Sequence, residues 1–396
     1  MKIVHLIDYF QPTLGYQEAF LAREQIRLGH DVTVVTSDRY APFSDYASTV
    51  QPILGERIRP TGRSIEEGIH VWRLPVQFEY RYRCWLKGLT QALVTLRPDV
   101  LHAHNVVKLT SLQAILLKPR LGYRLVVDDH TLQVAMDQSW QGNIFYGAFR
   151  LLLAPLFRRR VDALVAVTDG IADTIRQVYG LDRLPLQVIE LGIDTQLFRP
   201  DAVARQAKRV ELGLNPDDFL IVYTGKIIPT KAPHWLVEAL PHCPAEVKAL
   251  LVGNAPANYR RQIDQIIAKH GLSDRIIFHP AVRQAELPPY YVAADAGCWP
   301  REGSIGMFEA AACGLPIVIT AGELSQRVRY GNGLEYQEGD IADLARCLTQ
   351  LAQSQDQTRQ MGARGRQLVE EHLSWIEINR QFLAVYQGIS APNPNI

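Results

Sequence analysis

Cysteine is scarce in this sequence of 396 residues, and its spacing excludes two kinds of scaffold. The five cysteines are an odd number, and no two of them form a C-x-x-C pair. A disulfide framework or a structural zinc site depends on paired, closely spaced thiols. The pattern instead predicts isolated thiols in a reducing compartment; they are Cys84, Cys243, Cys298, Cys313 and Cys347.

The sequence also lacks long apolar runs and an excess of charge of either sign. No window approaches the roughly 20 consecutive apolar residues of a membrane span, and the apolar run at residues 1–8 is too short for a signal peptide. The formal net charge is +1, which argues against a nucleic-acid partner because neutralising phosphates needs surplus base. We therefore expect a cytoplasmic protein, working free or at the inner face of the membrane.

What the sequence does contain is an alternation of strand and helix patterns that occurs twice. An apolar strand at 2–7, a helix at 17–28 and a strand at 31–36 open the chain, which predicts parallel strands joined by right-handed crossovers. A second alternation begins with the strand at 219–224. The chain is too long for one core. We therefore predict an α/β protein of two Rossmann-like, doubly wound domains facing across a cleft, where ligands of such sheets bind.

The predicted boundaries follow from where this alternation stops and resumes. We predict that residues 1–192 form an N-terminal Rossmann-like domain, 193–374 a C-terminal Rossmann-like domain, and 375–396 a helical segment that crosses back to the first domain. The polar stretch 201–216 is interpreted as the linker. A helix is expected at 85–96.

The stretch at residues 299–316 is the one around which the chain is organised. A short strand precedes it, an apolar strand follows it, and between them lies a loop with Gly303 and Gly306. A helix opening on Ser304 and Ile305 would present unpaired amides and the positive end of its dipole to an anion. Glu309 lies one turn inside, where it can accept hydrogen bonds from hydroxyls. The alternative is an ordinary helix start with an exposed glutamate.

A second candidate site follows the strand at 219–224. Gly225 allows backbone to approach a ligand, and Lys226 and Lys231 flank the turn. Two ammonium groups near a helix start would hold a diphosphate and stabilise the charge left when a glycosidic bond breaks. Alternatively, both are solvated loop lysines.

In the first half, Gly15 ends the first loop and either approaches phosphate or serves as a turn glycine. His104 and His130 end two strands, where they can donate hydrogen bonds to hydroxyls or play a structural part. No Cys or Glu completes a ligand set with the H-x-H pair of His102 and His104, so we predict no metal.

Two segments combine basic and aromatic residues, at 81–87 and 145–160. One interpretation is a membrane-facing amphipathic surface beside the acceptor entrance. The other is a core-packing helix with cations at its C-terminus.

Taken together, these motifs resemble the retaining, nucleotide-sugar-dependent glycosyltransferases of family 4, which have the GT-B fold. The resemblance runs nearly end to end. It is carried by residues 1–15 with 17–18, and by 29–36, 99–104, 161–167, 191–200, 225–231, 309–316 and 331–334. Tyr16 stands where the family commonly has a second glycine. The resemblance implies that residues 1–192 form the acceptor-side domain and residues 193–374 the nucleotide-sugar-binding domain.

The resemblance implies the roles of the candidate residues. Lys226 and Lys231 would hold the donor diphosphate, and Glu309 the donor ribose. The loop Gly303, Ser304, Ile305, Gly306 would hold pyrophosphate and sugar, His130 would lie beside the reacting sugar, and Gly15 would contact phosphate. Glu302 is also assigned to donor binding. The family pattern places seven residues between two glutamates, whereas six separate Glu302 and Glu309 here.

The expected function is transfer of a sugar from a nucleoside-diphosphate sugar to a hydroxyl, with retention and without metal or cofactor. The acceptor would be a saccharide, a lipid-linked saccharide or a small molecule. Two alternatives are open: a non-catalytic nucleotide-sugar-binding subunit, which the glutamate spacing favours, and another GT-B enzyme such as a nucleotide-sugar epimerase.

Overall fold

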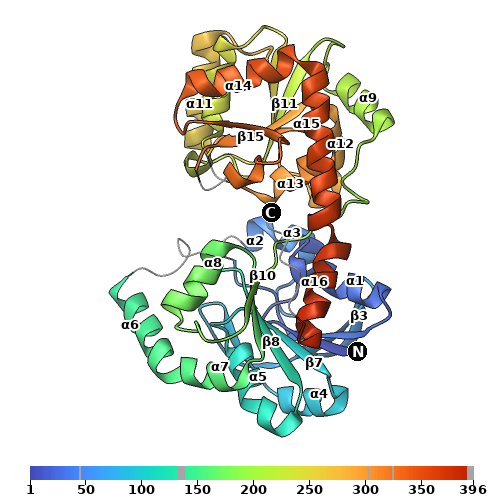
Figure 1. Ribbon diagram of the computed structural model, residues 1–396, viewed down its shortest axis with the longest axis vertical. Coiled ribbons are helices and arrows are strands. Elements are labelled where there is room, and N and C mark those ends of the chain that lie inside the picture. Colours follow the sequence, from blue (N-terminus) through green and yellow to red (C-terminus); the bar gives the residue numbers. More distant parts are fainter. Residues whose placement is uncertain (44–45, 132–138, 302, 323–324, 390–396) are drawn as a thin grey trace. The chain divides into compact units, whose positions relative to one another are not determined.

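A computed structural model describes all residues except 44–45, 132–138, 302, 323–324 and 390–396 (Figure 1). The chain divides into two compact units. The first is built from Met1–Gly192 together with the helix α16 (Trp375–Gln387), and the second from Ile193–Ser374. Each unit has its own hydrophobic core around a largely parallel sheet.

The first unit contains an eight-stranded sheet in the order β10-β9-β8-β7-β1-β2-β4-β3. All neighbours are parallel except β3 and β4, which form an antiparallel edge. A separate hairpin, β5-β6, follows β4. The strands are β1 (Lys2–Leu6), β2 (Asp31–Ser37), β3 (Gly62–Glu66), β4 (Ile69–Leu74), β5 (Val76–Tyr80), β6 (Arg83–Leu86), β7 (Val100–His104), β8 (Arg124–Asp129), β9 (Ala163–Ala166) and β10 (Leu186–Val188).

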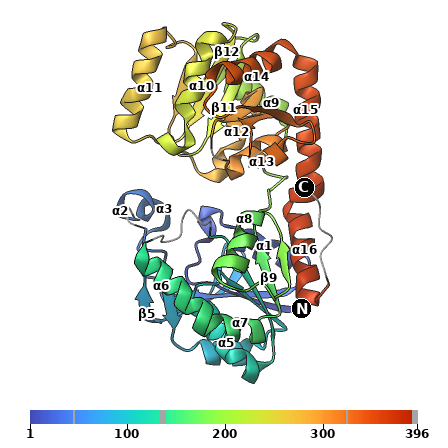
Figure 2. The same ribbon diagram turned by 60° about the vertical axis from the view of Figure 1, so that its left-hand side comes forward.

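Helices cover both faces of this sheet because its strands are apolar on both sides. One face packs against α1 and α16, which lie side by side in Figures 1 and 2, and the other against α4, α5 and α7. The helices are α1 (Gln17–Arg27), α2 (Tyr46–Thr49), α3 (Gln51–Leu54), α4 (Leu89–Leu96), α5 (Leu109–Leu121), α6 (Trp140–Ala148), α7 (Ala154–Arg160) and α8 (Asp169–Asp173).

The second unit contains a six-stranded, wholly parallel sheet in the order β13-β12-β11-β14-β15-β16. Its strands are β11 (Phe219–Thr224), β12 (Val247–Val252), β13 (Ile276–His279), β14 (Ala296–Trp299), β15 (Ile317–Thr320) and β16 (Gly333–Tyr336). Its helices are α9 (Ala202–Glu211), α10 (Pro233–Ala239), α11 (Ala257–His270), α12 (Pro288–Ala293), α13 (Ile305–Ala312), α14 (Ile341–Gln353) and α15 (Gln355–Leu368).

Two local expectations are wrong. The stretch 201–216 is not a linker, since it contains α9, whose N-cap Asp201 accepts a hydrogen bond from the Ala204 amide at 2.9 Å. Arg205 and Arg209 of α9 both pair with Asp295, so the polar residues serve ion pairs within the unit. Helix α4 begins only at Leu89, because Trp85 belongs to strand β6.

Among the described residues, no helix combines the length and the apolar character needed to cross a bilayer.

Candidate functional site

In the second unit, the candidate residues after β11 lie in a tight turn beside β12. Gly225 has a φ of 134°, and its amide donates to the Val252 carbonyl at 3.0 Å. The backbone oxygen of Gly225 would lie 1.9 Å from a Cβ built on Gly253, so the two turns require glycine where they meet. The result is a backbone fixed at the end of the strand.

Both predicted lysines extend from this turn. Lys226 is exposed, and its carbonyl accepts a hydrogen bond from the Tyr223 hydroxyl at 2.7 Å. Lys231 is half-buried and closes the short 3-10 turn Pro229–Lys231. Within the part of the chain that the structure describes, neither ammonium group has an acidic partner. Both remain available to a bound anion.

The predicted glycine loop leaves β14, the neighbour of β11 in the sheet, so both loops begin at the same sheet edge. Ser304 is the N-cap of α13, and its buried hydroxyl has no hydrogen-bond partner among the residues that the structure describes. A Cβ on Gly306 would lie 2.5 Å from Thr224 Oγ1 and 3.0 Å from the Tyr291 hydroxyl. Glycine at this position therefore lets the start of α13 approach the end of β11. Gly303 and Ile305, on either side of Ser304, are half-buried.

Glu309 points into the unit, in contrast to the exposed alternative considered from the sequence. The residue is 1% exposed, and its oxygens accept hydrogen bonds from Gln284 Nε2 at 2.6 Å and from the Tyr291 hydroxyl at 2.8 Å. Burial raises the pKa of Glu309, which these two donors oppose. The Tyr291 hydroxyl also contacts Thr224 Oγ1 at 2.7 Å, so Glu309 is tied to the end of β11. Its role toward a ribose stays a prediction, and Glu302 lies outside the described residues.

In the first unit, Gly15 closes the turn before α1 with φ 73° and ψ 29°, a left-handed conformation that suits glycine. Sequence reasoning missed its neighbour Gln17, the first residue of α1. This side chain is only 6% exposed, and within the described ranges neither polar atom of its amide has a hydrogen-bond partner. Buried amides are normally paired, so Gln17 marks the same turn as a place where a ligand or water would bind.

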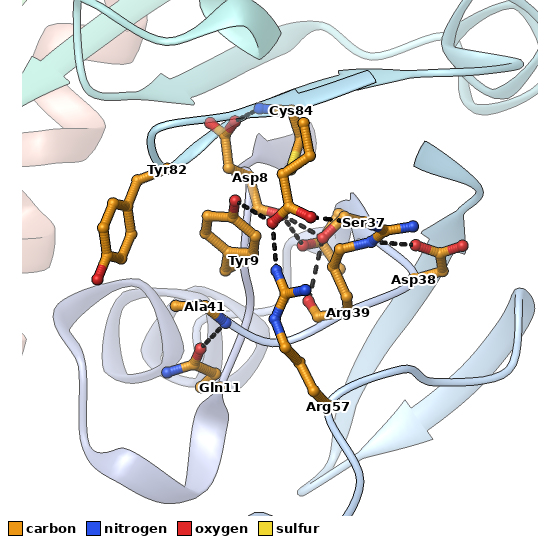
Figure 3. A network of polar contacts seen from close by, with 12 residues as sticks. Asp8, Tyr9, Gln11, Ser37, Asp38, Arg39, Ala41, Arg57, Tyr82 and Cys84 are labelled. Carbon is orange, nitrogen blue, oxygen red and sulfur yellow. Dashed lines mark hydrogen bonds and ion pairs between the residues drawn. The ribbon is translucent and has the colours of Figure 1, made fainter. Parts of the chain in front are cut away.

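Asp8, at the end of β1, holds the β5-β6 hairpin. Its carboxylate accepts hydrogen bonds from the Cys84 amide and, at 2.8 Å, from Thr110 Oγ1. The next residue, Tyr9, also contacts the hairpin. The side chains of Tyr9, Arg39 and Arg57, labelled in Figure 3, all donate hydrogen bonds to the carboxylate of Glu79 on β5. Asp8 is 1% exposed, so it positions the hairpin and does not face a substrate.

The hairpin forms one wall of a cavity of about 760 Å³, which also extends to α6 and to the ends of β7 and β8. None of the described residues that line it is acidic. Cationic and aromatic side chains predominate, among them Phe78, Tyr80, Arg81, Tyr82, Arg83, Lys108, Phe145 and Tyr146. Asn105 and Thr131, which flank His130, line it too. The cavity can therefore receive an anionic or ring-shaped ligand next to His130.

His130 follows β8 and is held by Asp128. Its Nε2 lies 3.1 Å from Asp128 Oδ2, and its side chain is 27% exposed. Burial opposes its charge, yet the Asp128 carboxylate raises the pKa of His130 to about 9. His104 is buried, and its Nδ1 lies 2.8 Å from the same oxygen.

Two sets of described side chains offer candidate metal-ligand atoms within 4.8 Å of one another: His5, His102 and His104, and His104, Asp128 and His130. Several of these atoms are already hydrogen-bonded to each other. His5 Nδ1 and His104 Nε2, for example, lie 3.0 Å apart, closer than the roughly 3.4 Å between two nitrogens bound to a tetrahedral zinc ion. The geometry favours hydrogen bonds over metal ligation.

The segment predicted at 145–160 packs against the core, as one of its two interpretations held, and membrane contact stays a prediction. Phe149 and Phe157 are buried in the core. On the outside, Trp140 is 70%, Leu151 75% and Leu152 69% exposed. The segment thus packs on one side and presents large apolar side chains on the other.

Comparisons with solved structures place both units in one architecture. A glycosyltransferase from Rickettsia africae superposes with a TM-score of 0.72 at 14% identity, covering 98% of this chain and 97% of that one. Anabaena Alr3699/HepE in complex with UDP superposes with a TM-score of 0.71 at 20% identity, covering 98% and 100%. These likenesses show the GT-B fold and confirm the predicted fold class.

Sequence comparisons then identify the family. Residues 19–197 match the model of Glycosyltransferase Family 4, and residues 218–354 match that of Glycosyl transferases group 1. A D-inositol 3-phosphate glycosyltransferase of Thermomonospora curvata is 31% identical over 73% of this chain and 71% of its own. One of Streptomyces bingchenggensis is 29% identical over 92% and 83%. A third, of Xylanimonas cellulosilytica, is 37% identical, but the match spans only 40% of each chain. The chain belongs to glycosyltransferase family 4.

Proposed function

We propose that this glycosyltransferase moves a sugar from a nucleoside-diphosphate sugar to an acceptor hydroxyl and retains the configuration at the anomeric carbon. The observation that carries the proposal is the shared edge of the second sheet. There, Lys226, Lys231 and Ser304 follow two neighbouring strands. Among the described residues, the lysines have no acidic partner and the Ser304 hydroxyl has no hydrogen-bond partner. Such a set suits a diphosphate, which needs both positive charge and hydrogen-bond donors.

The chemistry proposed for this site requires no nucleophilic side chain. As the glycosidic bond breaks, the leaving phosphate oxygen gains negative charge and takes the proton of the acceptor hydroxyl on the same face. Lys226, Lys231 and the first-turn amides of α13 stabilise that charge. These groups supply the positive charge for which other transferases use a divalent ion, so we propose that neither metal nor cofactor is needed.

For the acceptor, we propose a molecule with an anionic group, bound in the cavity beside His130. Arg83 and Lys108 supply positive charge there, and the tyrosines of the hairpin offer faces for a sugar ring. The relatives' names specify an acceptor of this kind, D-inositol 3-phosphate. On the donor side, a UDP-glucose complex of Alr3699/HepE supports testing UDP-sugars first.

The test begins with a thermal-shift panel of UDP-, GDP- and ADP-sugars, since a ligand of the folded state raises its stability. Transfer is then followed as release of nucleoside diphosphate in the presence of acceptors with and without phosphate. We expect Lys231→Ala to lower transfer by two to three orders of magnitude, as loss of one oxyanion-stabilising donor does. The control Lys269→Ala changes an exposed lysine on α11 and should leave transfer intact.

The same assay separates the alternatives. A binding subunit would release no nucleoside diphosphate with any donor. An epimerase would convert the donor with no acceptor present. Undiminished turnover of Lys231→Ala would contradict the role assigned to this lysine.

Exposed apolar side chains on α6 and on the helical turn Phe149–Leu153 that follows it support a second proposal, peripheral contact with a membrane. Trp140, Leu151 and Leu152 present apolar surface, and Arg158, Arg159 and Arg160 end the next helix. This combination suits an anionic bilayer surface. The triple variant Trp140→Ser, Leu151→Ser, Leu152→Ser should lose cosedimentation with phosphatidylglycerol vesicles. If the native protein does not sediment with them, the proposal fails.

A further inference from the structure

A ladder of buried polar side chains crosses the first sheet beneath α1 and α16. Strands β1, β7 and β8 are parallel neighbours, in which His5 is paired in register with His102, and His104 with Asp128. Because side chains alternate along a strand, His102 and His104 lie on one face, and it is the face that α16 covers. All four residues are 2% exposed or less.

Asp128 is the centre of this ladder. Its Oδ2 lies 2.8 Å from His104 Nδ1, 3.1 Å from His130 Nε2 and 3.3 Å from His102 Nε2. Within the described part of the chain, His102 Nε2 has this ion-pair contact but no hydrogen-bond partner. The other carboxylate oxygen of Asp128, Oδ1, accepts a hydrogen bond from the Asn105 amide at 2.9 Å. One carboxylate thus faces three imidazoles.

The ladder continues to the helices that cover the sheet. His5 Nε2 lies 2.8 Å from Gln25 Oε1 of α1, and His102 Nδ1 lies 2.7 Å from the Tyr386 hydroxyl of α16. The Tyr386 hydroxyl can donate to His102 Nδ1, which leaves the proton of a neutral His102 on Nε2, toward Asp128. The ring orientation of each histidine is therefore set by a partner on another element.

An ionised carboxylate only accepts hydrogen bonds, so His130 must place an N–H at Nε2 to satisfy Asp128. Its Nδ1 is then the ring nitrogen left for a bound ligand. A neutral His130 would carry no proton at Nδ1 and could only accept there. A protonated His130 donates from both nitrogens.

We propose that Asp128 is a positioning residue, which holds His130 protonated with Nδ1–H directed to the substrate, and that Tyr386 of α16 fixes the histidine ladder behind it. This inference rests on the proposed function, in which the acceptor binds in the cavity beside His130. A cationic donor there would stabilise a hydroxyl or a developing negative charge on the substrate.

The charges around His130 agree with this assignment. Asp128 raises the pKa of His130, and Glu18 of α1 and Asp129 of β8 act in the same direction. Burial by itself would raise the pKa of Asp128, but His104, His130 and His102 hold it well below its ordinary value. Burial lowers the pKa of His102 to about 4, so this neighbour stays neutral and does not compete for the charge.

The test is Asp128→Asn, which keeps the shape of the side chain and removes its charge. Histidine signals of the native protein and the variant are followed by NMR between pH 5 and 10, with His130→Gln to assign the signal. We expect the pKa of His130 to fall from about 9 toward the ordinary value of about 6.5. The alkaline limit of transfer activity should fall with it, which loss of packing alone would not produce.

Tyr386→Phe is a milder second variant in case Asp128→Asn does not fold. It removes the hydroxyl that faces His102 Nδ1, so the nitrogen spectrum of His102 should change from one tautomer to a mixture of two. The pKa of His130 should stay near 9, because Asp128 is intact.

Each result bears on a different claim. A native His130 pKa near 6.5, unchanged in Asp128→Asn, would overturn the positioning role even if transfer is normal. Absence of transfer with a native pKa near 9 would instead overturn the proposed function and leave the ladder standing. Stoichiometric zinc binding that Asp128→Asn abolishes would show a metal site in place of the hydrogen-bonded ladder.

Discussion

Gly306→Ala tests whether close approach of α13 to β11 builds the donor site. The added Cβ would lie 2.5 Å from Thr224 Oγ1 and 3.0 Å from the Tyr291 hydroxyl. Neither neighbour is free to move away, since these two hydroxyls contact each other at 2.7 Å and Tyr291 also donates to Glu309. The helix start must therefore shift, together with the amides and the Ser304 hydroxyl that it presents.

The expected cost is that of overpacking a core, about 1–3 kcal/mol in the free energy of unfolding. For a unit of this size, that lowers the melting temperature by roughly 2–12 °C. Differential scanning calorimetry measures the loss, and titration with UDP measures the accompanying fall in affinity. Thr224→Ala removes the atom that would lie nearest to the new Cβ. The double variant Gly306→Ala, Thr224→Ala should therefore recover part of the lost stability.

Gly365→Ala is the matched control, because it makes the same change in helix α15 of the same unit. There, the nearest atom, Ala311 Cβ, lies 3.4 Å away at ordinary contact distance, and alanine favours a helix by about 0.5–1 kcal/mol. Stability should be unchanged or slightly higher. If Gly306→Ala behaves like this control in both stability and UDP affinity, the reasoning about the approach of α13 is refuted.

Three further predictions concern the first unit. The pKa of His130 in the folded protein is raised to about 9, so its contribution to stability is complete below pH 6.5 and is lost as pH rises through 9. Urea unfolding across this range should show the free energy of unfolding fall by up to about 3 kcal/mol. Gly192→Ala would place a Cβ 2.4 Å from the Trp375 ring, and we expect its melting temperature to fall, whereas an unchanged value would contradict the contact. Arg83→Ala should raise KM for a phosphate-bearing acceptor by tenfold or more and leave donor KM unchanged; equal effects on both would argue against an acceptor site in the cavity.

The placement of the candidate donor residues was predictable because it depends on local patterns. Strand periodicity located β11 and β14, and glycine and N-cap residues located the turns that follow them. Neighbouring parallel strands end at the same edge of a sheet, so the sequence alone assigns Lys226 and Ser304 to one region. By contrast, the polar composition of 201–216 was misleading, because the ion pairs of α9 with Asp295 link residues about 90 positions apart.

The acceptor side was less predictable. Nothing in the sequence around Gln17 indicates that its amide is buried without a partner. Asp128 and Asp129 are adjacent acidic residues in the sequence, and only the register with β7 shows that Asp128 faces the histidines. Tyr386 lies 284 residues from its partner His102, a distance over which no local pattern carries information.

The sequence by itself determined that this chain forms two α/β units with glycine-bearing turns and cationic loops at strand ends, because strand and helix periods and turn preferences act over a few residues. Tertiary structure alone decided that Glu309 is buried against Tyr291, that Gly306 lies in close contact with Thr224, and that three imidazoles surround Asp128. Those outcomes depend on which side chains meet across strands and helices, and that is fixed only when the sheets are assembled and their faces are covered.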